Sequence, residues 1–499
     1  MGLSKQKREL TKRGSIKNHV FQGSDTGFRL FKSMGEEIIV HFDPDVDGVV
    51  AGLLVCRFLV KHGKRFQWYI NSHRSHDWGL SDDKVLCKDV IAVDFLISRE
   101  KIQELCDLGV KIISMDHHEN CKEPIYCQSN TGHKFEDGIR CGEGVVINNQ
   151  YPVEDEDSRY LSGAGVVFET LISWDSSFDT EENRALVGIT LLSDIRDIEN
   201  ELAEGYLYHT YSHKYKGYLK YLIDNTMGDR DYGFGLPKMD RSYVDYKFSP
   251  AINAALRYNY QEEVVNFMMG RCPLNLDYRD WQKKLIAKIR EDVKVVEFNH
   301  IKVCYFNEDG FSAVEKDVLS SFVGLAASTY LDGEKSVICY LISDNKVKRA
   351  SFRGRYNGLK YNESLSSILE GRGHGSAFGI IGLMPNKKLF TEVDRICGEL
   401  EESCGYEQKL QRVVNLSFFV NGKAFNVAED NMYKLSQNQT KLYYVGHGVV
   451  IKRKGANYTE YEVDGVPVMY FGLPIKDIYN NMPLITPTLE RGIVKFYFD

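Results

Sequence analysis

The chain has 499 residues, of which 43% are hydrophobic and 12% aromatic, and its formal net charge is −7. This composition excludes a disordered chain, and the length predicts two or three domains because it exceeds what one hydrophobic core usually supports. The acidic balance excludes a uniformly basic surface, so any nucleic-acid site must be a local patch.

Three further features indicate the compartment. No apolar run approaches the ~20 residues that span a bilayer. The basic, polar stretch 1–17 lacks the apolar segment of a secretory signal. Eleven cysteines, an odd number without a regular framework, are typical of reduced thiols. We therefore expect a cytoplasmic protein that does not enter a membrane.

The most informative stretch runs from His41 to Gly48 and reads His-Phe-Asp-Pro-Asp-Val-Asp-Gly. It follows the apolar residues 37–40 and precedes the apolar run 49–55, so we expect it at a turn between a buried strand and a helix. Three alternating aspartates repel one another unless a cation neutralises them. One imidazole and several carboxylates favour Mn²⁺ or Mg²⁺. Taken alone, the stretch also fits an exposed acidic turn in which Gly48 supplies an unusual backbone angle.

Two later strands end in residues of the same kind. The strand predicted at 90–93 ends in Asp94, and the strand predicted at 110–115 leads into the segment Asp116 to His118. Alternating strands and helices predict a mostly parallel, doubly wound sheet, whose ligands bind at the carboxyl ends of the strands. Three successive strand ends with carboxylate or imidazole groups therefore indicate a metal site more strongly than any single motif.

The next segments carry weaker signals. The insertion at 119–143 contains Cys121, Cys127, His133 and Cys141, which could hold zinc, but it lacks the paired spacing of common zinc sites. A helix predicted at 182–192 leads to Asp194. We assign this carboxylate to the metal site, although by itself it also reads as an ordinary polar residue at a helix end.

The second half of the chain contains a basic run and a glycine-rich segment. Residues 346–356 interleave five basic side chains with Phe352 and Tyr356, which suits a groove that follows a nucleic-acid backbone, or else a solvated charged face. The segment 371–375 precedes a predicted small-residue helix at 376–379, and its glycines would let backbone N–H groups approach an anion. Short alternating strands from about residue 410 predict a β-rich domain.

With these residues in view, the chain resembles the DHH–DHHA1 phosphoesterases, and among them the RecJ-type single-strand-specific 5′→3′ exonucleases. The resemblance covers about residues 37–385. It rests on Asp45-Val46-Asp47-Gly48, Val93-Asp94, Asp116-His117-His118, Leu191-Leu192-Ser193-Asp194 and the glycine–histidine segment 371–375.

The resemblance implies an α/β fold in which a doubly wound, mostly parallel sheet, the DHH domain, is joined by a helical connector to a smaller α/β domain, DHHA1. A β-rich domain follows at the C-terminal side. The expected division is a flexible basic lead at 1–20, a catalytic domain at 21–235, the connector at 236–298, a substrate-binding domain at 299–395 and the β-rich domain at 396–499.

The resemblance also implies the roles of individual residues. Two divalent cations, Mn²⁺ or Mg²⁺, are expected on Asp45, Asp47, Asp94, His117 and Asp194, with a further ligand from His41 or Asp43. Asp116 would orient an imidazole and His118 would lie near the scissile phosphate, so the expected catalytic residues are Asp47, Asp116, His117 and His118. The expected phosphate-binding residues are Arg74, Ser351, Arg353, Gly373, His374 and Gly375.

The expected activity is the metal-dependent hydrolysis of single-stranded DNA by a 5′→3′ exonuclease in DNA repair, recombination or replication. The expected partners are single-stranded DNA, with RNA oligonucleotides as a further substrate, and single-strand-binding or replication proteins that contact the C-terminal domain. One alternative is a phosphodiesterase for short oligoribonucleotides or cyclic dinucleotides. Another is a catalytically inactive replication scaffold, which the complete set of ligand residues argues against.

Overall fold

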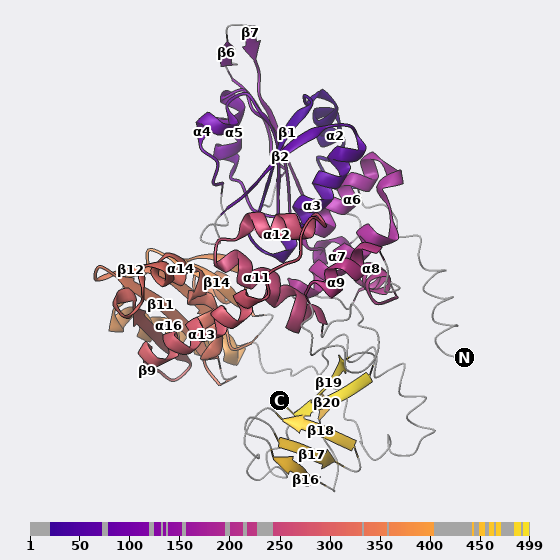
Figure 1. The fold of residues 1–499 in the computed structure, drawn as a ribbon. Coiled ribbons are helices and arrows are strands. Elements are labelled where there is room, and N and C mark those ends of the chain that lie inside the picture. Colours follow the sequence, from indigo (N-terminus) through magenta and orange to yellow (C-terminus); the bar gives the residue numbers. More distant parts are fainter. Residues whose placement is uncertain are drawn as a thin grey trace.

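The structure is a computed structural model. It describes residues 20–71, 78–118, 124–130, 133–135, 138–151, 156–194, 200–212, 217–226, 243–331, 334–356 and 359–403, together with the C-terminal strands given below. Within these residues, three six-stranded sheets organise the chain (Figure 1).

The first sheet has the strand order β2-β1-β3-β4-β8-β5, and all its neighbouring strands are parallel except β5. Its strands are β1 (Glu37–Phe42), β2 (Arg65–Ile70), β3 (Asp89–Val93), β4 (Lys111–Asp116), β5 (Tyr126–Gln128) and β8 (Glu143–Asn148). Phe42 pairs with Val93, and Val93 pairs with Met115. The residues that follow these strands therefore gather at one edge of the sheet.

Helices cover both faces of the first sheet, which confirms the doubly wound arrangement (Figure 1). One core lies under α2 (Ser24–Ser33), α3 (Val46–Lys61), α6 (Gly163–Trp174), α7 (Glu181–Ser193), α8 (Glu201–Ser212) and α9 (Gly217–Asp224). The other core lies under α4 (Asp82–Val85) and α5 (Arg99–Asp107). Both faces are apolar, which explains why all five residues of β3 are buried. The short elements here are η1 (Glu156–Tyr160), η2 (Ser176–Phe178), β6 (His133–Phe135) and β7 (Gly138–Arg140).

Three helices lead from the first sheet to the second. After η4 (Val244–Phe248) they are α11 (Ser249–Arg257), α12 (Gln261–Met268) and α13 (Asp277–Asp292). The packing of α11 and α12 against α3, and of α13 against α14 and β10, joins these helices to both parts of the fold.

The second sheet has the strand order β13-β14-β12-β11-β10-β9, and only β10 and β11 are parallel. Its strands are β9 (Lys294–Glu297), β10 (Ile301–Asn307), β11 (Ser336–Ser343), β12 (Lys346–Arg353), β13 (Glu370–His374) and β14 (Ala377–Ile381). Its helices are η5 (Glu308–Gly310), α14 (Ala313–Thr329), α15 (Tyr361–Ser364) and α16 (Lys387–Ser403). A separate apolar core lies on each face of this sheet.

The glycine-rich segment corrects one sequence prediction. Residues 376–379 do not form a helix, because β13 and β14 are the two strands of an antiparallel hairpin. Phe378 and Ile380 are buried while their neighbours are not, which is the alternation of a strand. A side chain at Gly371 would contact the Phe378 ring at 2.6 Å, so this glycine permits close packing across the hairpin.

Two helices differ from their predicted bounds. The amphipathic pattern over 278–298 predicts one long helix, but α13 ends at Asp292, because the β-branched pair Val295 and Val296 belongs to strand β9. The apolar pattern over 322–330 also predicts a helix, but α14 begins much earlier, at Ala313. Its signal is a capping box, in which the Ser312 side chain accepts from the Glu315 N–H and the Glu315 carboxylate accepts from the Ser312 N–H.

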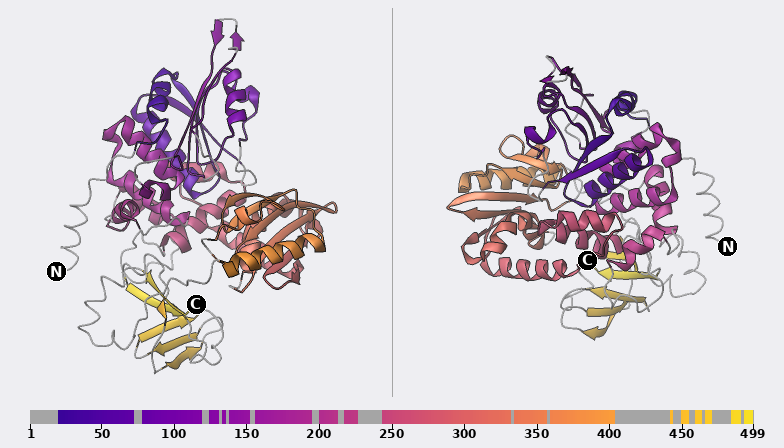
Figure 2. Two further views of the ribbon diagram at one scale, coloured as in Figure 1. Left: turned by 180° about the vertical axis from the view of Figure 1, so that it is seen from behind. Right: turned by 45° about the horizontal axis from the view of Figure 1, so that its top comes forward.

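The third sheet lies beyond residue 441 and has the strand order β15-β19-β20-β18-β17-β16. It is the yellow sheet in Figure 2. Its strands are β15 (Leu442–Tyr443), β16 (Val449–Lys454), β17 (Thr459–Val463), β18 (Val466–Tyr470), β19 (Leu484–Glu490) and β20 (Ile493–Phe498). Among the short strands that the sequence predicts beyond residue 410, the first, at 416–420, lies outside the described residues.

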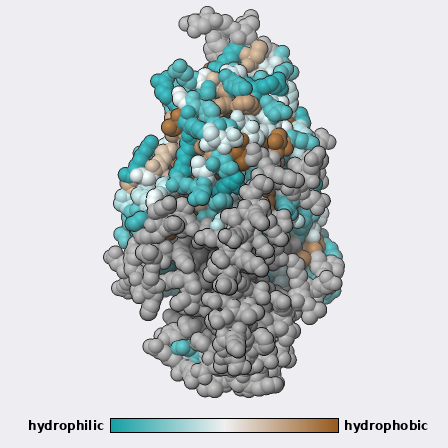
Figure 3. Space-filling view, turned by 90° about the vertical axis from the view of Figure 1, so that its right-hand side faces the viewer, coloured by the Kyte–Doolittle hydropathy of each residue, from teal (hydrophilic) through white to brown (hydrophobic). Residues whose placement is uncertain are grey.

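Among the described residues, no helix is long and apolar enough to cross a membrane. On the face drawn in Figure 3, the described residues are mostly hydrophilic, and apolar residues are scattered among them.

Candidate metal centre

The acidic stretch forms the turn between β1 and α3. Asp45 caps α3, because its side-chain Oδ1 accepts a hydrogen bond of 2.9 Å from the Gly48 N–H. A side chain at Gly48 would lie 2.5 Å from the Asp43 carbonyl oxygen, so only glycine fits this turn. The turn brings Asp43, Asp45 and Asp47 to the carboxyl edge of the first sheet.

The first residues of α6 hold the Asp47 carboxylate. It accepts hydrogen bonds from the Gly163 N–H at 2.6 Å and the Ala164 N–H at 3.0 Å. These donors belong to the first turn of the helix, where unpaired N–H groups favour a carboxylate. A side chain at Gly163 would overlap the Asp94 carboxylate, so this glycine leaves room for the second acid. The small residues Gly163 and Ala164 thus allow the start of α6 to approach both carboxylates closely.

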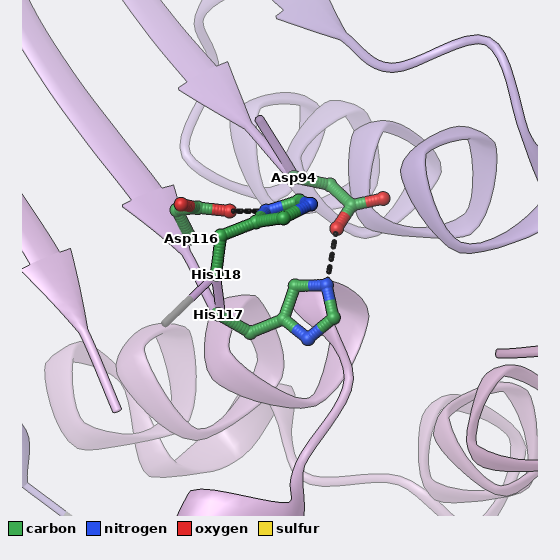
Figure 4. A group of neighbouring side chains, drawn as sticks. All are labelled: Asp94, Asp116, His117 and His118. Carbon is green, nitrogen blue, oxygen red and sulfur yellow. Dashed lines mark hydrogen bonds and ion pairs between the residues drawn. The ribbon is translucent and has the colours of Figure 1, made fainter. Parts of the chain in front are cut away.

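Asp94 and the Asp116–His118 segment follow the next two strands. Asp94 has φ 65°, a backbone conformation that is uncommon for a residue other than glycine and that often occurs at functional sites. Its Oδ1 lies 3.2 Å from His117 Nε2. Asp116 is fully buried and accepts a hydrogen bond of 2.7 Å from His118 Nδ1. Figure 4 shows both contacts and the two imidazoles beside the carboxylates.

Asp194 completes the cluster from the end of α7. Its Oδ2 lies 3.9 Å from His117 Nδ1, so His117 stands between two carboxylates from distant parts of the chain. The backbone around the imidazoles is held in place, because the Asn148 side chain donates to the His118 carbonyl and the Gln150 side chain donates to the His117 carbonyl.

Among the described residues, three groups of side chains could hold a metal ion. In each group, one ligand atom from every member lies within 4.8 Å of the others. The groups are Asp94, Asp116, His117 and His118; Asp47, His117 and Asp194; and Asp43, Asp45 and Asp94. Because the groups share Asp94 and His117, the arrangement is one continuous cluster. Carboxylates with one or two imidazoles suit Mn²⁺ or Mg²⁺.

The electrostatics of the cluster also fit a cation. Burial, then Asp194 and Asp45, raises the pKa of Asp47 to about 8. Burial and the neighbouring aspartates, Asp47 first, raise the pKa of Asp94 well above its ordinary value. Asp116 Oδ2 is buried and has no hydrogen-bond partner among the described residues. A divalent cation would offset this concentration of negative charge.

His118 differs from the acids in its charge. Burial alone would lower its pKa, but Asp116, Asp43 and Asp194 outweigh that effect and raise the pKa to about 9. The imidazole is therefore a proton donor at neutral pH, and it lines the cleft described below.

His41 lies outside the three groups. Its ring packs against Tyr69, Trp78 and Phe95, with centroid distances of 5.0, 5.1 and 4.5 Å. Its Nε2 donates to Asn71 Oδ1 at 3.3 Å. Burial lowers its pKa to about 3 despite that hydrogen bond, so the ring is neutral. Asp43, the alternative ligand, lies in a group with Asp45 and Asp94.

The cluster forms part of the wall of a cleft of about 960 Å³ that also involves the second sheet. From the first part of the fold, the cleft is lined by Asp43, Asp45, Asp94, His117, His118 and Asp194, and by the apolar Trp78, Leu80, Leu96 and Ile97. From the second part it is lined by Arg349, Ser351, Arg353, Gly373, Phe378 and Ile380 on strands, and by Ser320, Ser321, Gly324 and Leu325 on α14. Candidate metal ligands and basic side chains therefore share one cavity.

The structure places two of the expected phosphate-binding side chains in the cleft and supplies a third basic group. Ser351 and Arg353 lie side by side on β12, where Arg353 Nη1 donates to Ser351 Oγ at 2.8 Å. Arg257, at the end of α11, also lines the cleft. Burial, then the Arg353 charge, lowers the pKa of Arg257 to about 10. The stretch from Pro250 to Arg257 is among those that resemble RecJ-type sequences, but Arg257 was not among the expected phosphate-binding residues.

Some predicted positions lie outside the described residues. These are Arg74, the side chain of His374, Cys121 and the side chain of His133. Gly373 lines the cleft, and the Gly375 carbonyl accepts from the Asn362 N–H. In the part of the insertion that is described, Cys127 is buried and Cys141 is exposed, and neither belongs to a metal-type group. A zinc site there stays an untested prediction.

Comparisons with known proteins identify a matching family and solved structures with a similar fold. Residues 37–192 match the model of the DHH family, N-terminal domain. RecJ from Thermus thermophilus in complex with Mn²⁺ superposes with a TM-score of 0.66 at 16% identity, covering 97% of this chain and 72% of that one. The complex with Mg²⁺ gives 0.59 at 15% identity, with 97% and 70% covered. An exonuclease RecJ bound to manganese gives 0.50 at 17% identity, with 80% and 99% covered. No curated protein matches the chain by sequence.

Proposed function

The chain belongs to the DHH superfamily and has a RecJ-like fold, and from this premise we propose that it is a metal-dependent exonuclease for single-stranded DNA. The reaction is the hydrolysis of a phosphodiester bond in the cleft. Two divalent cations, Mn²⁺ or Mg²⁺, are the proposed cofactors, and repair, recombination or replication of DNA is the proposed setting.

The observation that carries the proposal is the pairing of opposite charges in one cavity. A buried acidic cluster and the guanidinium groups of Arg257 and Arg353 line the same cleft. A phosphodiester bound between them would contact cations on the acidic side and guanidinium groups on the other. Guanidinium groups bind phosphate oxygens through paired hydrogen bonds, so the arrangement suits a phosphate chain better than a neutral ligand.

Each residue has a proposed task in the reaction. Asp43, Asp45, Asp47, Asp94, His117 and Asp194 would hold the metals, which supply an activated water and offset charge on the leaving oxygen. Asp116 orients the His118 imidazole through the 2.7 Å hydrogen bond. Because His118 lines the cleft and carries a proton at neutral pH, it can donate a hydrogen bond to the phosphate.

The apolar part of the cleft supports a single-stranded substrate. Trp78 and Leu96, from the first part of the fold, and Ile381, from the second, line the cavity and are at least partly exposed. Apolar and aromatic surfaces accept any unpaired base by stacking, whereas bases in a duplex already stack on one another. Preference for a single strand would therefore come from shape and stacking.

A double substitution tests the proposed activity. We expect Asp47→Ala/Asp94→Ala to reduce Mn²⁺-dependent cleavage of a labelled single strand by at least about 100-fold, because it removes ligands from all three groups. Asp280→Ala, at an exposed ion pair on α13, is the control and should keep full activity. Undiminished turnover in the double variant would refute the assignment. The same strand labelled at either end would show the polarity of digestion.

One observation favours a second candidate. A cavity of about 960 Å³ is of the size that holds a whole drug-sized ligand, so a short oligoribonucleotide or cyclic dinucleotide could also be the substrate. Comparing turnover of a long 5′-phosphorylated strand with that of a dinucleotide separates the two activities. An inactive scaffold is disfavoured, because all the ligand carboxylates and imidazoles that the superfamily implies converge here.

A further inference from the structure

Helix α14 (Ala313–Thr329) forms a wall of the cleft and packs against β12. Its positions 321, 324 and 328 share one face, because residues three and four apart are neighbours on a helix. These positions hold Ser321, Gly324 and Ser328, and the first two line the cleft. The face is therefore made of small residues beside the guanidinium of Arg353.

Gly324 is the point of closest approach. A Cβ built on it would lie 2.6 Å from Arg353 Nη2 and 3.4 Å from Ser351 Oγ. Non-bonded heavy atoms need about 3.5 Å, so a methyl group at this position cannot coexist with the present place of the guanidinium. The absence of a side chain at residue 324 thus creates the space that Arg353 occupies.

The remaining contacts of Arg353 fix its plane without neutralising it. Nη1 donates to Ser351 Oγ at 2.8 Å and to the Phe352 carbonyl at 2.7 Å. Nε donates to Ser328 Oγ at 3.3 Å. Among the described residues, Nη2 makes no hydrogen bond and no carboxylate pairs with Arg353. The guanidinium is held by neutral groups only, so its charge stays available for an anion.

Ser321 gives an independent sign of a ligand. Its side chain is 8% exposed and its Oγ has no hydrogen-bond partner among the described residues. Buried hydroxyls are nearly always hydrogen-bonded, because leaving one unpaired costs free energy. Since Ser321 lines the cleft one helical turn from Gly324, a bound molecule is the natural partner for its hydroxyl.

We propose that α14 is a substrate-binding wall of the cleft, in which Gly324 is a positioning residue for Arg353 and Ser321 donates a hydrogen bond to an oxygen of the substrate's sugar–phosphate backbone. This inference rests on the proposed function, and it adds α14 to the residues that the superfamily resemblance implied.

The test is Gly324→Ala. Alanine favours a helix more than glycine, and the contact is with the end of a flexible side chain, so the variant should unfold at the same or a higher temperature. We expect KM for a single-stranded oligonucleotide to rise on the order of tenfold, the scale of a lost charged hydrogen bond, with kcat changed much less. Thr329→Ala, on the same helix but outside the cleft lining, is the matched control.

A double-mutant cycle shows whether the effect passes through Arg353. In an Arg353→Ala background, Gly324→Ala should not raise KM further, because the displaced group is absent. Ser321→Ala should raise KM several-fold both with and without Arg353, since the proposed hydrogen bond from Ser321 to the substrate does not involve Arg353. Equal effects of Gly324→Ala with and without Arg353, or an unchanged KM in both single variants, would overturn the proposal.

A binding measurement separates this inference from the proposed activity. Inorganic pyrophosphate, titrated calorimetrically, reports on Arg353 and Ser321 without any cleavage. Weaker binding in Gly324→Ala and Ser321→Ala than in Thr329→Ala upholds the α14 wall even if no oligonucleotide is cleaved. If pyrophosphate and oligonucleotide both bind these variants as tightly as the parent chain, the α14 wall is refuted.

Discussion

Asp47 shows how one residue combines structure and chemistry. Two N–H groups of α6 hold its carboxylate, yet burial and two neighbouring aspartates raise its pKa to about 8. The metal-free chain therefore keeps a proton on a group that must lose it to bind a cation. The proposed binding of a cation at this residue would therefore release its proton.

The stability of the metal-free chain should therefore depend on pH. The folded chain holds the Asp47 proton more tightly than the unfolded chain, where the pKa is near 3.8. The free energy of unfolding that the tightly held Asp47 proton contributes is thus fully present below about pH 4. This contribution is lost as the pH rises through about 8, at up to about 1.4 kcal/mol per pH unit. Thermal unfolding in EDTA should show Tm falling over this window, and less steeply in Asp47→Asn. If Tm fell equally steeply with pH in the parent chain and in Asp47→Asn, the raised pKa of Asp47 would be contradicted.

Substitutions of His41 and of Asp43 should affect metal binding differently. His41→Phe keeps an aromatic ring among Tyr69, Trp78 and Phe95 and removes only the Asn71 hydrogen bond. We expect its Mn²⁺ affinity, measured by calorimetry, to stay within about threefold of the parent. Asp43→Asn should lose at least about tenfold, because Asp43 belongs to a group with Asp45 and Asp94. A larger loss in His41→Phe than in Asp43→Asn would make His41 the ligand.

At the scale of elements, strand ends were the most predictable part of the fold. Apolar runs at 38–42, 90–93 and 110–115 all form parallel strands of one sheet, because strands buried on both faces need continuous apolar residues. Carboxylates and imidazoles at their ends then converge by topology alone. Sequence reasoning could therefore predict which acidic and imidazole side chains come together in the candidate metal site.

Other elements depend on contacts that spacing does not reveal. The segment 376–379 was predicted as a helix because its residues are small, but pairing with β13 and burial of Phe378 make it a strand. Arg257 joins the cleft only because α11 ends beside the second sheet. The role of Gly324 depends on the position of Arg353, a residue that β12 supplies. These features depend on tertiary packing, which overrides local propensity.

At the scale of the whole molecule, the cleft joins two unlike surfaces. Residues from β1 to α7 bring the acidic groups, and α11, α14 and the second sheet bring the basic and apolar groups. Neither half contains all the groups that the proposed reaction needs. Helix α11 packs on both α3 and α14, whereas α12 packs on α3 and α13 packs on α14 and β10, so the three helices together connect the two sides of the cavity.

The shape of the cleft predicts the form of the substrate. A cavity of about 960 Å³ whose lining includes the partly exposed Trp78, Leu96 and Ile381 offers an aromatic ring and apolar surface to unpaired bases. We expect a blunt duplex to be cleaved at least about 100-fold more slowly than the single strand of the same sequence, and a single-stranded overhang to restore cleavage. Because Arg257 and Arg353 would contact phosphates, binding of the single strand should weaken as salt rises. Equal rates on blunt duplex and single strand, measured with Mn²⁺ and end-labelled DNA, would show that the cleft does not select its substrate by shape.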